Sequence, residues 1–151
     1  MTTIPGFATS EATAALADRF DEIAYAQLGR TGLRCSQAAF GCYRVADGVA
    51  MHREALTLAL KNGINLIDTS ANYADGESEV LVGKVLTDHF RSGTLRREEL
   101  IVVSKVGYLQ GRNYALSQDR KAQGRPFPDL VPYAEGLEHC IHPAFLEDQL
   151  T

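Results

Sequence analysis

Residues 63–79 read Gly-Ile-Asn-Leu-Ile-Asp-Thr-Ser-Ala-Asn-Tyr-Ala-Asp-Gly-Glu-Ser-Glu and contain clear local structure signals. Gly63 is the residue type that commonly ends a helix, and the apolar run 64–68 predicts a buried strand. The polar, glycine-containing stretch 69–77 predicts a loop. Ser78 is suited to cap a following helix, because its hydroxyl can accept a backbone N–H of the first turn. A strand, a loop and a helix are therefore expected in succession.

The same alternation continues on both sides of this segment. Apolar residues predict a short strand over 37–40 that ends at Gly41, and another strand over 100–104. Apolar residues with a period near 3.6 predict helices over 49–62 and from 78 to about 93. Strands that alternate with helices indicate an α/β fold with a parallel sheet.

The N-terminal part of the chain precedes this alternation. Residues 1–24 are predicted to be an extension, with a helix that Ser10 caps and that continues to about Tyr25. In the main domain, 25–151, two short extended pieces flank Arg30-Thr31-Gly32. This is the chemistry of a β-hairpin, because glycine tolerates a positive φ.

The region after the third strand has a different composition. Residues 106–142 are rich in glycine, proline and polar residues, which predicts a long connection with a functional or mobile character. Pro143 is suited to the first turn of a last helix over 144–150. His139 and His142 precede that helix, and we expect them to have a structural or loop role, since two ligands do not make a zinc site.

Composition excludes several classes of function. The chain has 151 residues, 45% of them hydrophobic and 23% charged, with a net charge of −4 and no basic stripe. This is the balance of a globular domain and offers no electrostatic footprint for nucleic acid. No apolar run is long enough for a membrane helix, and no secretory signal begins the chain. We therefore expect a cytoplasmic protein that uses neither membrane nor nucleic acid as a partner.

The cysteines do not predict a metal site. They are Cys35, Cys42 and Cys140, an odd number at wide spacing and without a CxxC pair. Such a set is a poor disulfide framework. Three reduced thiols and no bound metal are expected.

Three polar residues follow predicted strands. Asp68 closes the second strand, Tyr73 lies in the loop after it, and Lys105 closes the third. Side chains at the carboxyl ends of parallel strands line the ligand face of an α/β fold. An ammonium beside a tyrosine favours the phenolate, and a carboxylate keeps that ammonium charged and oriented. Such a tyrosine can exchange a proton with a carbonyl or an alcohol, whereas the hydride must come from a cofactor.

Four segments resemble one known family, the aldo/keto reductases. Leu28–Ser36 and Phe40-Gly41 resemble its N-terminal hairpin and first strand. Residues 63–79 resemble the signature that follows its second strand, and 101–105, Ile-Val-Val-Ser-Lys, resemble its third strand. The resemblance implies a (β/α)₈ barrel. This chain would be the N-terminal portion, an α/β partial TIM barrel with the hairpin and about three β/α units, because a whole barrel needs about 250 residues.

The resemblance also implies an activity and its residues. The family reduces aldehydes and ketones to alcohols with NADPH, or less often NADH, bound without a Rossmann motif. Tyr73 would be the proton donor, Lys105 would tune it, and Asp68 would pair with Lys105. Ala74 stands where many relatives have glycine. The family's catalytic histidine follows a fourth strand, which we do not find in this sequence.

Further positions match the loop after the family's first strand, which borders nicotinamide and substrate. Gly41 and Cys42 would contact the cofactor, and Tyr43 would face a small carbonyl substrate. Two functions stay open. The chain is either part of an NAD(P)H-dependent oxidoreductase that is inactive as a truncated chain, or a catalytically dead fragment that binds a partner or is purely structural. Open sheet edges predict self-association.

Overall fold

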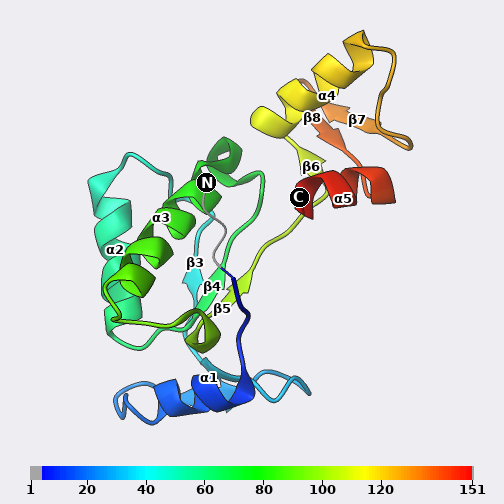
Figure 1. The fold of residues 1–151 in the computed structure, drawn as a ribbon. Coiled ribbons are helices and arrows are strands. Elements are labelled where there is room, and N and C mark those ends of the chain that lie inside the picture. The colour runs from blue at the N-terminus through cyan, green and yellow to red at the C-terminus, as the bar shows by residue number, and fades with distance from the viewer. Residues whose placement is uncertain (1–4, 151) are drawn as a thin grey trace.

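The central layer is a parallel sheet. The computed structural model describes residues 5–150. In it, β3 (Phe40–Gly41), β4 (Leu66–Asp68) and β5 (Ile101–Val103) lie side by side in the order β3-β4-β5, and both pairings are parallel. The predicted α/β fold is confirmed, although each strand is shorter than expected. The sheet is open and forms part of a barrel only (Figure 1).

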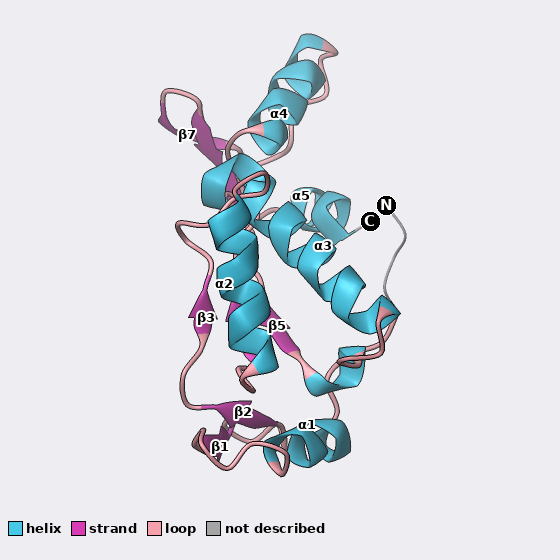
Figure 2. Cartoon of the chain, turned by 90° about the vertical axis from the view of Figure 1, so that its left-hand side faces the viewer, coloured by secondary structure: helices cyan, strands magenta, loops and turns pink. Residues whose placement is uncertain are grey.

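Two helices cover one face of this sheet. They are α2 (Ala50–Lys61) and α3 (Glu77–Arg91), seen in front of the strands in Figure 2. Their apolar side chains pack with strand residues into one core. The core residues with at most 1% exposure are Leu16, Cys42, Leu56, Leu60, Ile67, Leu81, Val85 and Leu100. Because each buried aliphatic side chain contributes roughly 1.5–3 kcal/mol, this cluster holds the helices on the sheet.

The predicted hairpin is confirmed. β1 (Tyr25–Gln27) and β2 (Arg34–Ser36) pair antiparallel. Gly32 in the turn has a φ of +79°, which glycine adopts without the steric cost that a Cβ imposes.

Asn65 joins this hairpin to the sheet. Its side chain is fully buried just before β4. The Oδ1 atom accepts the N–H of Ser36 at 2.8 Å, and the Nδ2 atom donates to the carbonyls of Arg34 at 3.0 Å and Glu99 at 3.2 Å. One amide thus satisfies backbone groups from two segments that lie on either side of it in the sequence.

The N-terminal helix is shorter than predicted. α1 spans Ser10–Ala17, so its expected continuation to Tyr25 is wrong. Tyr25 instead begins β1, and its hydroxyl donates to the carbonyl of Gly63 at 2.6 Å. Thr9, not Ser10, is the N-cap, because Thr9 Oγ1 accepts the N–H of Ala12 at 3.2 Å. Residues 1–4 of the predicted extension lie outside the described residues.

Residues 106–142 are not an irregular connection, and that prediction is wrong. They form a second unit with an antiparallel sheet of order β6-β8-β7, set apart from the parallel sheet in Figure 1. Its elements, with the final helix, are β6 (Tyr108–Leu109), α4 (Arg112–Ala122), β7 (Val131–Ala134), β8 (Leu137–His139) and α5 (Pro143–Leu150). The strands are too short and α4 too polar to give a periodic apolar pattern.

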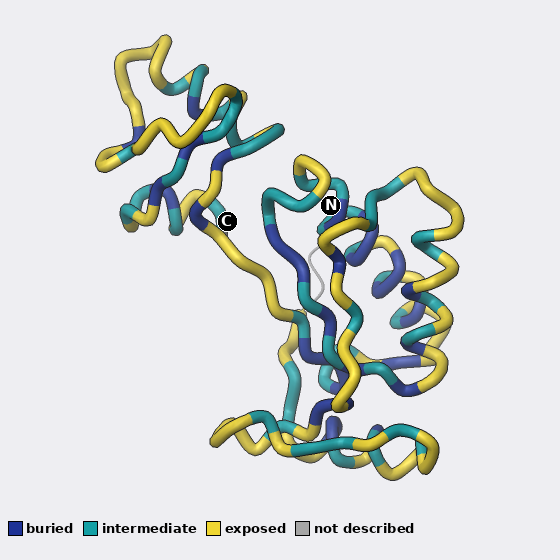
Figure 3. Tube along the Cα trace, turned by 180° about the vertical axis from the view of Figure 1, so that it is seen from behind, coloured by how far each residue is buried: buried dark blue, intermediate teal, exposed yellow. Residues whose placement is uncertain are grey.

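The second unit has its own core. Figure 3 shows its buried positions apart from those of the parallel sheet, and the core consists of Leu109, Phe127, Cys140 and Phe145. Glu138 is also buried, at 4% exposure. Burial would raise its pKa, but the Lys121 ammonium, the Ser117 hydroxyl at 2.5 Å and the Gln118 amide at 3.1 Å outweigh this effect, and the pKa of Glu138 is lowered. A buried carboxylate therefore ties α4 to β8.

Candidate active site

Asp68, Tyr73 and Lys105 come together at the carboxyl ends of the strands. Asp68 is the last residue of β4, and Lys105 lies two residues after β5. The Lys105 Nζ atom is 2.7 and 2.8 Å from the two carboxylate oxygens of Asp68, and 2.9 Å from the carbonyl oxygen of Thr69. An ammonium has three N–H donors. The three acceptors therefore hold Lys105 in one position.

Tyr73 lies against this ammonium. Lys105 Nζ is 4.8 Å from the centroid of the Tyr73 ring, within the range of a cation–π contact. The hydrogen bond with Asp68 raises the pKa of Lys105, and Tyr73 adds to this rise. Lys105 therefore stays protonated at neutral pH. Its side chain is 47% exposed and that of Asp68 42%, so the pair adds little to stability and serves mainly to place charge beside Tyr73.

The turn that presents Tyr73 is strained. It spans η1 (Tyr73–Gly76), in which Ala74 has a φ of +48° and Asp75 a φ of +56°. For residues with a Cβ, this left-handed region costs roughly 1–2 kcal/mol each. Gly111 of the second unit packs on the turn, and a Cβ at Gly111 would stand 2.6 Å from the Cβ of Asp75. The second unit thus supports the segment that carries Tyr73.

Two buried hydroxyls fix the strand ends, and sequence reasoning missed them. Ser78 was predicted to cap a helix, which is wrong, because α3 begins at Glu77 and the Ser78 side chain turns inward. Its Oγ atom donates to the carbonyl of Cys42 at 3.1 Å and is 3.0 Å from the Oγ1 atom of Thr69. The amide of Cys42 donates to the carbonyl of Asp68 at 2.8 Å. The only feature of the sequence that could have indicated this network is a hydroxyl residue at each end of the 69–78 segment.

The three residues predicted after the first strand lie at different depths. Gly41 is exposed, with nothing within 4 Å of where a Cβ would stand. Cys42 has no exposed surface, and burial raises the pKa of its thiol to about 11. Tyr43 is 66% exposed, and its ring meets that of Tyr73 edge to face, with centroids 5.2 Å apart. Of the predicted cofactor pair, Gly41 is thus the residue that a bound molecule could reach.

A shallow pocket opens beside Tyr73. Its volume is about 370 Å³, and its walls come from the loop after β3, the loop after β4 and the start of the second unit. The lining residues are Tyr43, Arg44, Asn72, Tyr73, Ala74 and Gln110. Gln110 could not be expected from the sequence, because only the folding of residues 106–142 brings it to this place.

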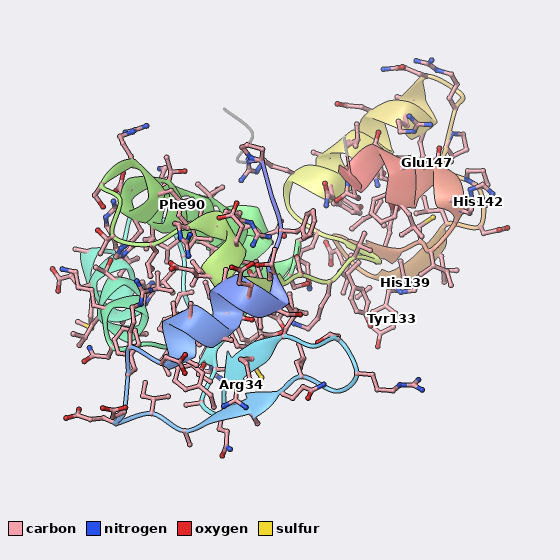
Figure 4. The ribbon with its side chains drawn as sticks, turned by 60° about the horizontal axis from the view of Figure 1, so that its bottom comes forward. Arg34, Phe90, Tyr133, His139, His142 and Glu147 are labelled. Atoms are coloured by element: carbon pink, nitrogen blue, oxygen red, sulfur yellow. The ribbon has the colours of Figure 1, made fainter. Side chains whose placement is uncertain are left out.

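The two histidines of the second unit lie outside the site. His142 Nδ1 accepts the N–H of Ala144 at 3.1 Å, at the start of α5. His139 meets the ring of Tyr108 edge to face, with centroids 5.0 Å apart, and Figure 4 shows it near Tyr133. Within residues 5–150, no three His, Cys, Asp or Glu side chains are grouped so that they could hold a metal ion. None of the helices in that range has the length and apolar character to cross a membrane.

The fold and the comparisons with known proteins lead to one family. An open parallel sheet preceded by a hairpin, with polar side chains at its strand ends, defines part of an α/β protein. The model of the aldo/keto reductase family matches residues 48–124, just over half of the chain. The chain belongs to the aldo/keto reductase family, a family of oxidoreductases.

The chain is similar to several individual proteins. Aldo-keto reductase family 4 member C11 of Arabidopsis thaliana is 35% identical over 86 residues, which are 57% of this chain and 25% of the relative. The thermostable aldo-keto reductase Tm1743, solved with the inhibitor epalrestat, is 27% identical with a TM-score of 0.50, over 73% of this chain and 45% of that one. The silkworm Bombyx mori protein AKR2E5, solved with NADPH, is 23% identical with a TM-score of 0.46, over 69% of this chain and 32% of that one. The chain therefore spans between a quarter and a half of the length of these relatives.

Proposed function

We propose that this chain supplies the Asp68, Tyr73 and Lys105 part of an NAD(P)H-dependent site that interconverts aldehydes or ketones and alcohols. The observation that carries the proposal is the position of Lys105, which three oxygens hold within 4.8 Å of the Tyr73 ring. An immobilised ammonium beside a phenol is suited to proton transfer. Membership of an oxidoreductase family supports the same reaction class.

Each residue has a distinct task in the proposed reaction. The Tyr73 hydroxyl donates its proton to the carbonyl oxygen as the carbon is reduced, and the tyrosinate then takes a proton from solvent. Lys105 stabilises the tyrosinate by its charge. Asp68 touches neither substrate nor cofactor; it keeps Lys105 charged and directed at the ring. In the reverse direction the tyrosinate accepts the proton of the alcohol.

The chain offers a place for the nicotinamide end of NADPH or NADH. The cofactor, when bound, supplies the hydride. Gly41 is exposed at the end of β3, its register partner in β4 is Asp68, and the space where a Cβ would stand is empty. A planar ring can approach the backbone closely at such a position. Tyr43, which meets Tyr73 edge to face, would border the small carbonyl substrate. Cys42 is fully buried and would support the cofactor position without touching the cofactor.

We propose that residues 1–151 by themselves neither reduce carbonyls efficiently nor bind NADPH tightly. Hydride transfer needs the reacting atoms held within roughly 3–3.5 Å of each other. The pocket is shallow and has walls from only three segments, so it places few constraints on a bound pair of molecules. The cytoplasmic location stays a prediction from the sequence.

The test is Tyr73→Phe, with Tyr114→Phe as a control from α4. Both variants are assayed for aldehyde-dependent oxidation of NADPH, in the chain alone and in the chain joined to the C-terminal part of a family member. In the joined protein, Tyr73→Phe should lower turnover about 10²–10⁴-fold and leave NADPH affinity unchanged, while Tyr114→Phe should have no effect. Turnover of Tyr73→Phe within threefold of the parent would contradict the assignment.

A further inference from the structure

The pocket beside Tyr73 presents hydrogen-bond donors that have no protein acceptor. Asn72 Oδ1 accepts the hydroxyl of Ser70 at 2.7 Å, which turns the amide nitrogen of Asn72 away from this bond. Within residues 5–150, that nitrogen, the side chain of Gln110 and the guanidinium of Arg44 have no hydrogen-bond or ion-pair partner. Three segments of the chain thus contribute side chains with free N–H groups to the lining of one pocket.

Three carboxylates of the neighbouring segments, those of Asp68, Glu77 and Asp47, are paired with other cations. Asp68 binds Lys105 through both oxygens, and Glu77 pairs with Arg112 at 3.3 Å. Asp47, three residues after Arg44, pairs with Lys84 at 2.5 Å. Asp75 belongs to the same turn as Tyr73, but it packs against the second unit and does not line the pocket. Among residues 5–150, Arg44 thus has no ion-pair partner.

Arg44 is also well placed with respect to Tyr73. Its Cζ atom is 5.9 Å from the centroid of the Tyr43 ring, and the Tyr43 ring meets that of Tyr73 at 5.2 Å. The guanidinium is thus one aromatic ring removed from the proposed proton donor. A small molecule could contact both groups at once, with an anionic end at Arg44 and a carbonyl at Tyr73.

We propose that this pocket selects carbonyl substrates that carry a carboxylate or phosphate group, and that Arg44 binds this group. The inference rests on the proposed function, since it assumes that the carbonyl lies at Tyr73. A guanidinium suits such groups because its planar donors match two oxygens at once. The amides of Asn72 and Gln110 would complete the donor set. The phosphates of the cofactor share this chemistry, so the experiment has to separate the two sources.

The experiment measures binding to the purified chain by isothermal titration calorimetry and by backbone amide NMR. The probes are para-carboxybenzaldehyde, its uncharged methyl ester, and ADP-ribose, which carries the pyrophosphate found in the cofactor. Arg44→Gln removes the charge at the pocket. Arg91→Gln is the matched control, because Arg91 is also exposed but lies at the far end of α3, about 20 Å along the helix from Glu77.

The carboxylated aldehyde should bind the parent about tenfold more tightly than the ester, as expected for a charge-assisted hydrogen bond. Arg44→Gln should remove this difference, Arg91→Gln should retain it, and the shifted amides should include those of Tyr43 and Asn72. Equal affinities for aldehyde and ester, a difference that survives Arg44→Gln, or no binding of either at millimolar concentration would overturn the proposal. Loss of ADP-ribose binding alone in Arg44→Gln would assign the arginine to the cofactor and overturn it as well.

These binding measurements, taken together with the turnover of the joined protein described above, separate this inference from the proposed function. Tyr73→Phe retains the ring and loses only the hydroxyl, so it should keep the preference for the carboxylate. If the Arg44-dependent preference is present while Tyr73→Phe turns over like the parent, the reaction assignment fails and the anion site stands. If Tyr73→Phe is inactive and the parent shows no preference for the carboxylate, the reaction assignment stands and the anion site fails.

Discussion

Replacing Asn65 by alanine should destabilise the protein far more than its position in a short connection suggests. The substitution removes three hydrogen bonds from a fully buried amide to the backbone of Ser36, Arg34 and Glu99. Each hydrogen bond contributes about 1 kcal/mol, and a buried group left unsatisfied costs about 1–3 kcal/mol. Partial solvation of the hairpin edge offsets part of this, so we expect a loss of about 3 kcal/mol in the free energy of unfolding.

The chain offers a matched control for this change. Asn62 also donates its amide to a backbone carbonyl, that of Leu58 at 2.8 Å, but this bond is exposed and lies within one helix end. Asn62→Ala should therefore cost no more than about 1 kcal/mol. Urea unfolding followed by circular dichroism gives both free energies, with the slope of the transition checked for equality.

Hydrogen exchange shows whether the loss has the expected origin. In the parent, the amide of Ser36 is protected by the side chain of Asn65. In Asn65→Ala this amide should exchange faster than an amide held within the hairpin itself, such as that of Leu28, which donates to the carbonyl of Leu33 at 2.9 Å. If Asn65→Ala unfolds within 1 kcal/mol of the parent, or if the Ser36 amide keeps its protection, Asn65 does not hold the hairpin on the sheet.

Three other outcomes are expected. In the joined protein, Lys105→Met should reduce carbonyl turnover by about 10²-fold or more, and Asp68→Asn should reduce it by less. The control Lys84→Met, which breaks a similar pair with Asp47, should leave the rate unchanged. Unaltered turnover in Lys105→Met would make Lys105 an ordinary surface residue. Gly111→Ala should destabilise the protein by more than Gly124→Ala. Both glycines have a positive φ, but only at Gly111 would a Cβ stand 2.6 Å from the Cβ of Asp75. Equal free energies of unfolding for the two variants would show that the turn at Asp75 moves aside without destabilising the protein. Burial, together with the charge of Lys61, lowers the pKa of His89 from 6.5. The unfolded chain therefore binds the proton more readily, and the free energy of unfolding should fall as the pH drops below that value. His89→Gln should flatten this pH dependence in urea titrations, and an unchanged profile would exclude His89 as its source.

The sequence by itself predicted the parallel core and the polar residues that lie at its edge. Apolar runs bounded by glycine and polar loops predicted the strands that end at Gly41, Asp68 and Val103, because such continuous runs are typical of parallel strands. The residue types at Asp68, Tyr73 and Lys105 indicated proton transfer to a carbonyl. These signals are local: a periodicity of a few residues, or one side chain at the end of a strand, is visible without knowledge of the fold.

Only the tertiary structure decided which groups meet. The amide of Asn65, the hydroxyls of Thr69 and Ser78, and the contact of Gly111 with the Tyr73 turn join segments distant in sequence. The second unit also escaped detection, because its short strands and polar helix depend on long-range packing around Phe127 and Phe145 and not on local periodicity. A small polar side chain gives no pattern of its own. Whether it caps a helix, as expected of Ser78, or is buried in a strand-end network depends on which carbonyl the fold brings within hydrogen-bonding distance.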